Sequence, residues 1–307
     1  MTFKVYSKQF LILSTILITG VIGINIYFNE FGLYGNVKGK PYKIHAYEKV
    51  SKYLYTYNYI PSNFDSVIIG PSYSNNNMNP SKIINYKSYN LSMSGANIDE
   101  IQVSINNLIK YHKELKLVIF SINPYIVDSI GFKEFELSDK LMLSTLGSIV
   151  NIKYYTKKYI NNNKCNTYKY SENGYRNTEC RDNNSTYEIN KKLNELNKRV
   201  YDLKINNLAI LKLKKLLIEL SSKKFNLLVY YHPYPLRVYN NKYFQSKYKY
   251  FYTETNNLLL NNNISYIDFN DERYNYITSD DDTFSDSGHL SENGASKIFR
   301  VLNNKLK

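Results

Sequence analysis

Two short segments of this chain carry side chains that can act together as a nucleophile and a base. Asp286 and His289 lie three residues apart in Asp-Ser-Gly-His, close to the C-terminus. At that spacing the carboxylate can hold one ring nitrogen of the imidazole, which leaves the other free to accept a proton. Far upstream, Ser72 follows the apolar run 65–69 and is the candidate nucleophile, with Ser74 as a rival further from that run. This set predicts serine hydrolase or acyltransferase chemistry.

The elements expected to position these residues follow the rhythm of a parallel sheet with covering helices. Five short apolar runs, each ended by polar residues, Gly or Pro, are expected to be strands. They cover 65–69, 86–93, 116–122, 225–231 and 264–269, and apolar residues at helical spacing mark 97–112, 189–220, 241–260 and 291–304. We therefore predict an α/β fold, a three-layer α/β/α domain with a parallel sheet.

Further candidate residues follow the ends of these strands, where active sites of open parallel sheets form. The backbone N–H groups of Ser72 and Gly95 and the side-chain amide of Asn123 are the predicted oxyanion hole. Gly95 has no side chain, so its backbone can approach a ligand closely. His232 also ends a strand, and we interpret it as structural or substrate-facing because no carboxylate lies near it in the sequence.

These residues resemble the conserved blocks of the SGNH (GDSL-like) hydrolase superfamily, which carry a serine, an oxyanion glycine, an asparagine and Asp-x-x-His in this order. The matching segments are Gly70-Pro71-Ser72, Asn90 to Gly95, Ser121-Ile122-Asn123-Pro124 and Asp286 to His289, over residues 65–297. Pro71 and Pro124 stand where the family has Asp, and Ser121 stands where it has Gly. The resemblance implies that Ser72 is the nucleophile, His289 the base and Asp286 its orienting partner, without a metal or organic cofactor.

The N-terminus carries an apolar run, Phe10–Phe28, without a charge and about as long as a helix that crosses a bilayer. No small-x-small cleavage site follows, so we predict an uncleaved signal anchor rather than a cleaved signal peptide. Lysines flank both sides, and the short N-terminal tail favours a domain outside the cytoplasm. Cys165 and Cys180 either close a disulfide there or remain free thiols. The predicted organisation is 1–30 anchor, 31–60 connector and 61–307 SGNH-like domain, with a polar insertion around 130–190.

An N-terminal anchor is typical of the membrane-anchored branch of this superfamily, which includes the proteins of lipoteichoic-acid D-alanylation and alginate O-acetylation. The resemblance implies a single-pass cell-membrane protein that works beside a polytopic membrane acyltransferase. The expected activity is acyl transfer or ester hydrolysis on an envelope glycan or polymer. The alternative is a non-catalytic protein of the same fold that binds polymer or supports the acyltransferase, which the altered blocks at Pro71 and Pro124 keep open.

The net charge of +14 does not point to nucleic acid. Lysines are scattered along the chain, and no nucleic-acid-binding motif is present. The chain is rich in Lys, Asn, Ile and Tyr, with 33 Tyr and no Trp. These residues have A/T-rich codons, so genome composition explains much of the bias. An affinity for anionic envelope polymers stays open. The acidic run 280–282 lacks the spacing and closing Glu of an EF-hand loop, so no metal is predicted there.

Overall fold

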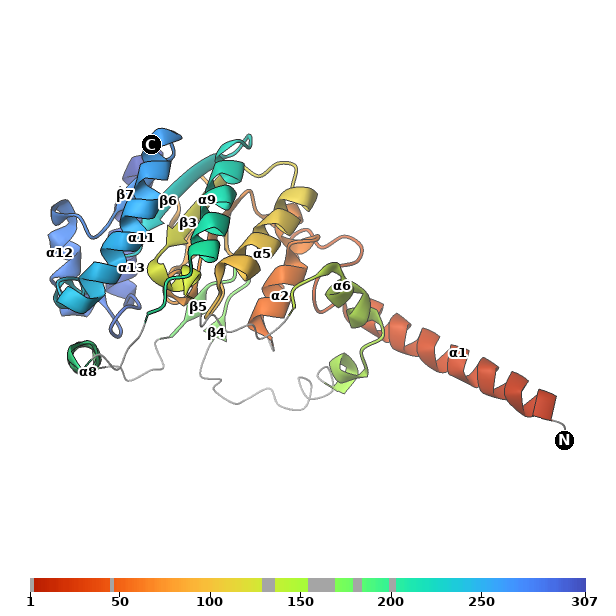
Figure 1. Ribbon diagram of the computed structural model, residues 1–307. Helices are drawn as coiled ribbons and strands as arrows, with labels where there is room; N and C mark the ends of the chain where they lie inside the picture. The colour runs from red at the N-terminus through yellow and green to blue at the C-terminus, as the bar shows by residue number, and fades with distance from the viewer. Residues whose placement is uncertain (1–2, 45–46, 129–135, 154–168, 179–183, 199–202) are drawn as a thin grey trace.

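The computed structural model describes residues 3–44, 47–128, 136–153, 169–178, 184–198 and 203–307 (Figure 1). Its centre is a sheet of five parallel strands in the order β2-β1-β3-β6-β7. The strands are β1 (Ser66–Ile69), β2 (Ser88–Asn90), β3 (Leu117–Ile122), β6 (Asn226–Tyr231) and β7 (Ser265–Asp268). All five expected strands are confirmed. Strand β2 is shorter than predicted. The Asn90 side-chain carbonyl accepts the Ser92 N–H in an Asx turn just after it, while the Leu91 and Met93 N–H groups still donate to the Ile68 and Gly70 carbonyl oxygens.

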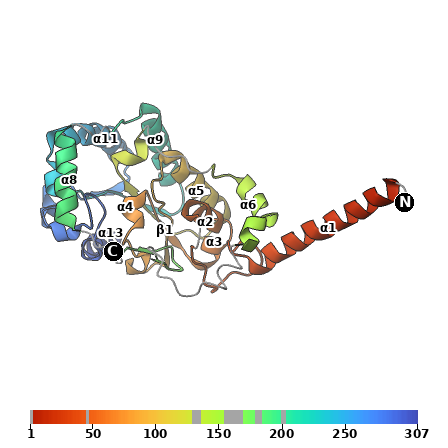
Figure 2. The same ribbon diagram turned by 90° about the horizontal axis from the view of Figure 1, so that it is seen from below.

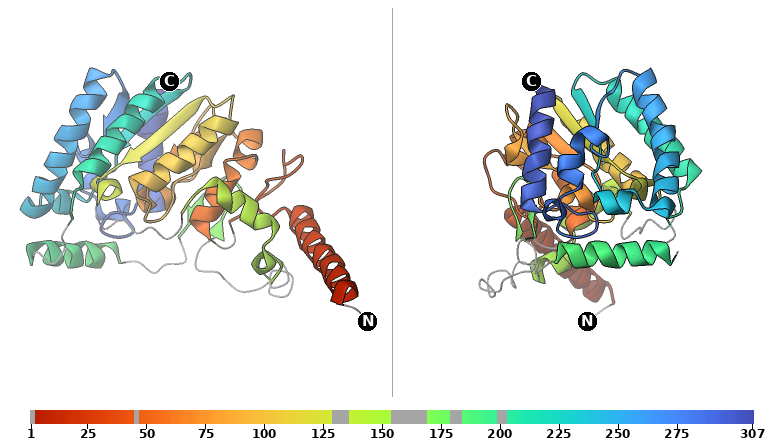
Figure 3. Two further views of the ribbon diagram at one scale, coloured as in Figure 1. Left: turned by 45° about the vertical axis from the view of Figure 1, so that its right-hand side comes forward. Right: turned by 90° about the vertical axis from the view of Figure 1, so that its left-hand side faces the viewer.

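Both faces of the sheet are covered by helices. Helices α5 (Ile98–Tyr111), α9 (Asn207–Ser221) and α11 (Lys242–Asn261) pack on one face, and α13 (Glu292–Leu306) packs on the other, as Figure 3 shows. Neighbouring side chains of a strand point to opposite faces, so Val67 and Ile69 enter one core and Ile68 the other. Burial on both faces explains the continuous apolar runs. The predicted three-layer α/β/α fold is confirmed.

Helix α1 (Phe3–Phe28) projects away from the domain (Figures 1 and 2). Its segment Val5–Phe28 is long and apolar enough to cross a membrane, with a mean hydropathy of 2.1. A signal sequence has the same properties, so the helix agrees with the predicted anchor without fixing its orientation.

Two helices begin within residues 31–60, for which the sequence predicted a polar connector. Helices α2 (Glu48–Tyr55) and α3 (Tyr59–Asn63) precede the sheet and contact α5. Leu54 and Ile60 are fully buried in the core that covers this face. Tyr53, Tyr55 and Tyr59 of this region are buried in the same core, while the domain boundaries themselves remain a prediction.

The predicted insertion around 130–190 carries ordered elements as well. It contains α6 (Asp139–Leu146), a small hairpin of β4 (Lys169–Tyr170) and β5 (Arg176–Asn177), and the start of α8 (Ser185–Asn197). The helical pattern 189–220 is split between α8 and α9, and the Asn206 side chain caps the second helix. Cys165 and Cys180 lie outside the described residues, so the disulfide stays a prediction. The remaining short helices are α4 (Ser72–Asn75), η1 (Pro80–Lys82), η2 (Pro124–Val127), α10 (Leu236–Tyr239), η3 (Glu272–Tyr274), α12 (Asn275–Thr278) and η4 (Asp281–Thr283).

Candidate active site

The strand order creates a switch point between β1 and β3. After β1 the chain moves outward to β2, and it then returns to the other side of β1 to form β3. At such a point the connections leave the sheet in opposite directions and open a crevice beyond the strand ends. Ser72 begins α4 directly after β1, and Asn123 follows β3. The sequence thus places both candidates at the crevice that the topology makes.

The structure brings Ser72, His289 and Asp286 into one hydrogen-bonded chain. His289 Nε2 lies 3.0 Å from Ser72 Oγ, and His289 Nδ1 lies 2.7 Å from Asp286 Oδ2. The His289 and Asp286 side chains are about one-fifth exposed. This is the arrangement in which an imidazole can take the serine proton while the carboxylate fixes its tautomer.

Local hydrogen bonds preform the turn that carries the acid and the base. Asp286 Oδ1 accepts the backbone N–H groups of Gly288 (2.9 Å) and His289 (2.8 Å). Burial raises the pKa of Asp286, but the hydrogen bond and charge of His289 and these two N–H groups outweigh it and lower the pKa to about 2. The carboxylate is therefore ionised at neutral pH, as an orienting partner must be.

His232 packs against the turn that carries Asp286 and His289. It is fully buried, its ring stacks on Tyr73 with centroids 4.8 Å apart, and its Nε2 lies 2.7 Å from the Gly288 carbonyl oxygen. Desolvation lowers the pKa of His232 to about 3, so the ring is neutral and donates from Nε2. Gly288 also packs so closely on Tyr73 that a Cβ would lie 2.6 Å from its ring. Of the two interpretations given for His232, the contacts favour the structural one.

The buried His232 predicts a pH dependence of stability. Its pKa is lower in the folded state than its ordinary 6.5, so the unfolded chain binds more protons below pH 6.5. Stability that is full above pH 6.5 should fall as the pH drops towards 3. His232→Gln keeps an N–H donor for Gly288 but does not titrate, so its free energy of unfolding should fall less between about pH 6.5 and 4. Denaturant unfolding at a series of pH values measures this, and equal slopes in both proteins would contradict it.

The predicted oxyanion donors differ in how much the structure supports them. Asn123 is fully buried, its Oδ1 accepts the Tyr125 N–H (3.0 Å), and its Nδ2 has no hydrogen-bond partner among the described residues. A buried amide donor without a partner is costly unless a ligand uses it. Gly95 is exposed with φ +61°, and a Cβ there would meet nothing within 4 Å. No hydrogen bond among the described residues joins Gly95 to Ser72, so the role of Gly95 stays a prediction.

Ser74, the rival nucleophile, lies in a different environment. It is fully buried, and its hydroxyl donates to Ser92 Oγ (2.9 Å) and approaches the Pro71 carbonyl oxygen. The imidazole of His289 contacts the hydroxyl of Ser72 instead. The geometry therefore favours Ser72 as the residue that the base can activate.

A buried ionic network that the sequence analysis missed lies beside the site. Glu48 on α2 accepts hydrogen bonds from the Ser94 N–H (2.8 Å), the Asn75 amide (2.7 Å) and the Tyr170 hydroxyl (2.5 Å), and Arg176 lies 3.6 Å away. It thus joins the helix that begins at Ser72 to the loop that carries Gly95 and to the β4–β5 hairpin. The only sequence signal was a group of charges within an aromatic stretch, Tyr47-Glu-Lys-Val-Ser-Lys-Tyr.

Two lysines of α2 complete this network. Lys52 is fully buried and donates to Asn75 Oδ1 (2.8 Å) and to the Ser92 carbonyl oxygen, and desolvation lowers its pKa to about 7. Lys49 pairs with Glu100 at 2.9 Å and lies 3.4 Å from the Gly95 carbonyl oxygen. The loop between Ser92 and Gly95 is therefore held by side chains of α2.

No group of three His, Cys, Asp or Glu side chains in the described part of the chain could hold a metal ion. In the acidic run 280–282, Asp280 pairs with Lys297 and Asp281 with Arg237. These ion pairs give the carboxylates a structural role.

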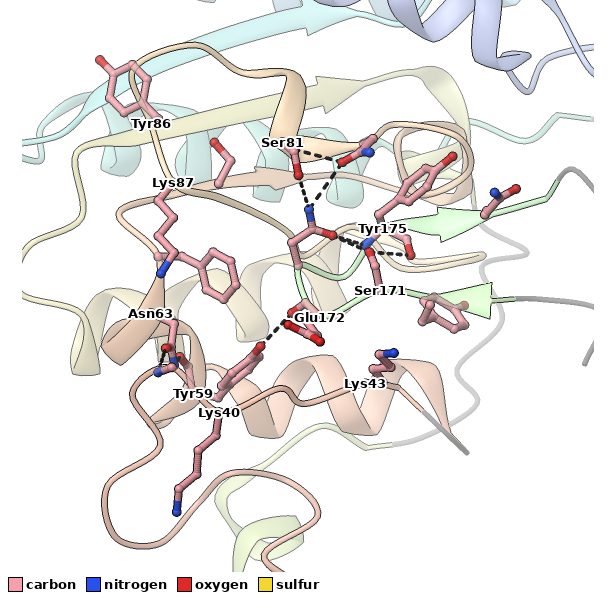
Figure 4. Close-up of a pocket in the computed structure, with 17 residues that line it drawn as sticks. Lys40, Lys43, Tyr59, Asn63, Ser81, Tyr86, Lys87, Ser171, Glu172 and Tyr175 are labelled. Carbon is pink, nitrogen blue, oxygen red and sulfur yellow. Dashed lines mark hydrogen bonds between the residues drawn. The ribbon is translucent and has the colours of Figure 1, made fainter. Parts of the chain in front are cut away.

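A cavity of about 830 Å³ lies beside β2, apart from the Ser72, Asp286 and His289 side chains (Figure 4). Tyr175 and Asn177 of the β4–β5 hairpin line it, whereas Arg176 between them contacts Ser94. Side chains alternate along a strand, so Tyr175 and Asn177 face the cavity and Arg176 faces the loop beside the site, while Tyr170 lines the cavity and also contacts Glu48. Three lysines line the cavity, Lys40, Lys43 and Lys87, together with one acidic residue, Glu172.

Comparison with known proteins leaves the family open. No family model matches the chain, and no curated protein matches it. One solved structure with a similar fold is described as "a putative platelet activating factor from Streptococcus pneumonia". The two chains are 9% identical with a TM-score of 0.47, over 85% of this chain and 91% of that one. At this level of similarity, the neighbour assigns neither a family nor an activity.

Proposed function

We propose that this protein is a serine esterase or O-acyltransferase, anchored in the cell membrane by α1, that acts on acyl esters of an envelope glycan or polymer. The observation that carries the proposal is the chain of hydrogen bonds from Ser72 through His289 to Asp286, at 3.0 and 2.7 Å. Its members come from opposite ends of the sequence and meet at the switch point of the sheet. The resemblance to the SGNH superfamily supports the same assignment.

In the proposed reaction, Ser72 Oγ attacks the acyl carbonyl carbon while its proton passes to His289 Nε2. The carbonyl oxygen becomes an oxyanion, for which the Ser72 and Gly95 N–H groups and the Asn123 amide are the proposed donors. When the C–O bond of the ester breaks, His289 gives its proton to the leaving alcohol and the acyl group stays on Ser72. Water or a sugar hydroxyl then loses a proton to His289 and attacks this acyl-enzyme, which restores Ser72.

The envelope part of the proposal is supported by α1 and by the cavity beside β2. A segment such as Val5–Phe28 retains a protein at a membrane, and the domain would then face acylated polymers outside the cytoplasm. Lysines and tyrosines around the cavity, with Lys40, Lys43 and Lys87 against Glu172, suit an anionic polymer chain. A polytopic membrane acyltransferase is the proposed donor of the acyl group, because the resembling branch of the superfamily works beside one.

Labelling of the full-length chain with a serine-reactive fluorophosphonate tests the proposal directly. Wild-type protein should be labelled, and the label should map to Ser72 by peptide mass spectrometry. Folded protein that is neither labelled nor able to hydrolyse p-nitrophenyl acetate would favour the non-catalytic alternative, in which the same domain binds polymer or supports the acyltransferase.

The Asn123 amide, which no described residue pairs, gives a second expected result. Asn123→Ala should lower kcat by roughly 10²–10³, because one oxyanion donor is lost. Asn123→Asp keeps the acceptor for the Tyr125 N–H but replaces the donor with a charge that repels an oxyanion, so it should be at least as severe. Hydrolysis of p-nitrophenyl acetate measures both, with labelling of Ser72 as the control for an intact nucleophile. An Asn123→Ala variant with wild-type kcat would remove Asn123 from the oxyanion hole.

A further inference from the structure

Helix α6 and the residues that follow it expose aliphatic side chains beside α1. Leu143, Ile149 and Val150 are 66%, 68% and 67% exposed. Helix α6 itself contains no buried residue, unlike α5 and α9, which cover the sheet. We call residues 139–150 the α6 segment. Three large aliphatic side chains, each two-thirds exposed within eight residues, mark a surface that suits an apolar environment.

Asn25 joins the α6 segment to α1. Only 6% of the apolar part of α1 is buried, yet Asn25 itself is only 4% exposed. Its amide donates to the carbonyl oxygens of Leu146 (2.8 Å) and Ser148 (3.2 Å). Leu146 is the last residue of α6, where a helix leaves its carbonyls without partners, and Ser148 follows two residues later. One side chain of α1 therefore satisfies the end of another helix.

This contact fixes the level of the α6 segment along α1. An amide within a membrane-crossing run needs an internal hydrogen-bond partner, since lipid supplies none. Asn25 lies three residues before the end of the helix at Phe28, which is about 4.5 Å along its axis. Tyr27, 84% exposed, is an aromatic residue of the kind enriched at a membrane boundary. The end of α6 thus lies at the level where α1 would leave the bilayer.

The other end of α6 is tied to the catalytic domain. Asp139 accepts a hydrogen bond from the Tyr57 hydroxyl (2.5 Å), and Leu141 and Met142 pack against the core that covers the α5 face. One side of the α6 segment thus packs against the domain, and the aliphatic side chains of Leu143, Ile149 and Val150 remain exposed. Lys140 is exposed at the start of the segment, where it can meet anionic headgroups.

We propose that the α6 segment lies in the headgroup region of the bilayer that α1 crosses, with Leu143, Ile149 and Val150 inserted among the lipids. The occupant of this surface is lipid, because the exposed aliphatic side chains continue the apolar surface of α1 at its boundary level. The α6 segment then gives the domain a second membrane contact and restricts its rotation about α1. This inference rests on the membrane anchor in the proposed function and is independent of the catalytic assignment.

The absence of Trp from the chain gives a clean test. Single Trp reporters replace Leu143, Ile16 in the middle of α1, or Leu260 on α11, which lies at the far end of the domain from α1 (Figures 1 and 2). Leu143 and Leu260 are similarly exposed, at 66% and 54%, so Leu260→Trp is the matched control. Full-length protein is placed as single copies in nanodiscs whose lipids carry bromine either on the upper part of the acyl chain, for the α6 and Leu260 reporters, or near its end, for Ile16→Trp and again Leu260→Trp; bromine quenches nearby Trp fluorescence.

The Leu143→Trp and Ile16→Trp reporters should both be quenched severalfold more than the Leu260→Trp reporter. Val150→Trp is a second reporter and should behave as Leu143→Trp does. Quenching of Ile16→Trp without quenching of either α6 reporter would overturn the inference and leave the anchor intact. No quenching at Ile16 would overturn the anchor and the inference together, while fluorophosphonate labelling of the same samples reports on catalysis separately.

Discussion

Ser72→Ala and His289→Ala should each reduce esterase activity by about 10⁴-fold or more, and the double variant should be little worse than either. The nucleophile cannot act without the base that takes its proton, and the base is useless without the nucleophile, so the two losses do not add. Asp286→Asn should have a similar or smaller effect. It spoils the orientation of the His289 imidazole, whose Nδ1 lies 2.7 Å from Asp286 Oδ2, but it does not remove the base. The measurement is kcat/KM for p-nitrophenyl acetate with full-length protein in detergent.

Ser74→Ala is the matched control for these variants. It removes a hydroxyl from the same short helix, but one that is buried against Ser92 and does not contact His289. Ser74→Ala should therefore keep fluorophosphonate labelling and most of the activity. Activity that survives Ser72→Ala in protein free of contaminating esterases, or that disappears only in Ser74→Ala, would refute the assignment of the nucleophile.

The strands and the contact between Asp286 and His289 were predictable because their signals are local. Strands buried on both faces are short apolar runs, and a Gly-Pro pair ends the first of them at Ile69. The Asp-x-x-His spacing allows one turn to place the carboxylate against the ring, and in the structure Asp286 Oδ2 lies 2.7 Å from His289 Nδ1. The proximity of Ser72 follows from sheet topology, because ends of parallel strands share one edge.

The support around the site was not predictable, because it depends on contacts between distant residues. Glu48 meets Asn75, Ser94 and Tyr170, which come from three different segments. A lysine such as Lys52 gives no sign in the sequence that it is fully buried, since charged side chains are normally exposed. The β4–β5 hairpin has strands of two residues and therefore no apolar alternation to detect.

Close packing at Gly294 leads to the largest expected effect on stability. Gly294 lies in the first turn of α13, where its N–H donates to the Ser291 hydroxyl oxygen (3.0 Å). A Cβ at this position would overlap the Thr283 carbonyl oxygen and lie 2.9 Å from Thr283 Cγ2. That carbonyl also accepts the Ser291 N–H (2.9 Å), so the backbone of η4 has little freedom to withdraw. Any shift there moves both ends of the turn that carries Asp286 and His289.

Gly294→Ala should therefore destabilise the protein by about 3 kcal/mol, the upper end of the usual cost of overpacking. For a chain of this size the Tm should fall by roughly 5–10 °C. Gly147→Ala is the control: this glycine follows α6 with φ −90°, and a Cβ there meets nothing within 4 Å, so the change should stay within about 0.5 kcal/mol. Thermal unfolding followed by circular dichroism compares the two variants. Equal Tm values would show that η4 can move away from α13. The inference that packing of η4 against α13 fixes the Asp286–His289 turn would then be wrong.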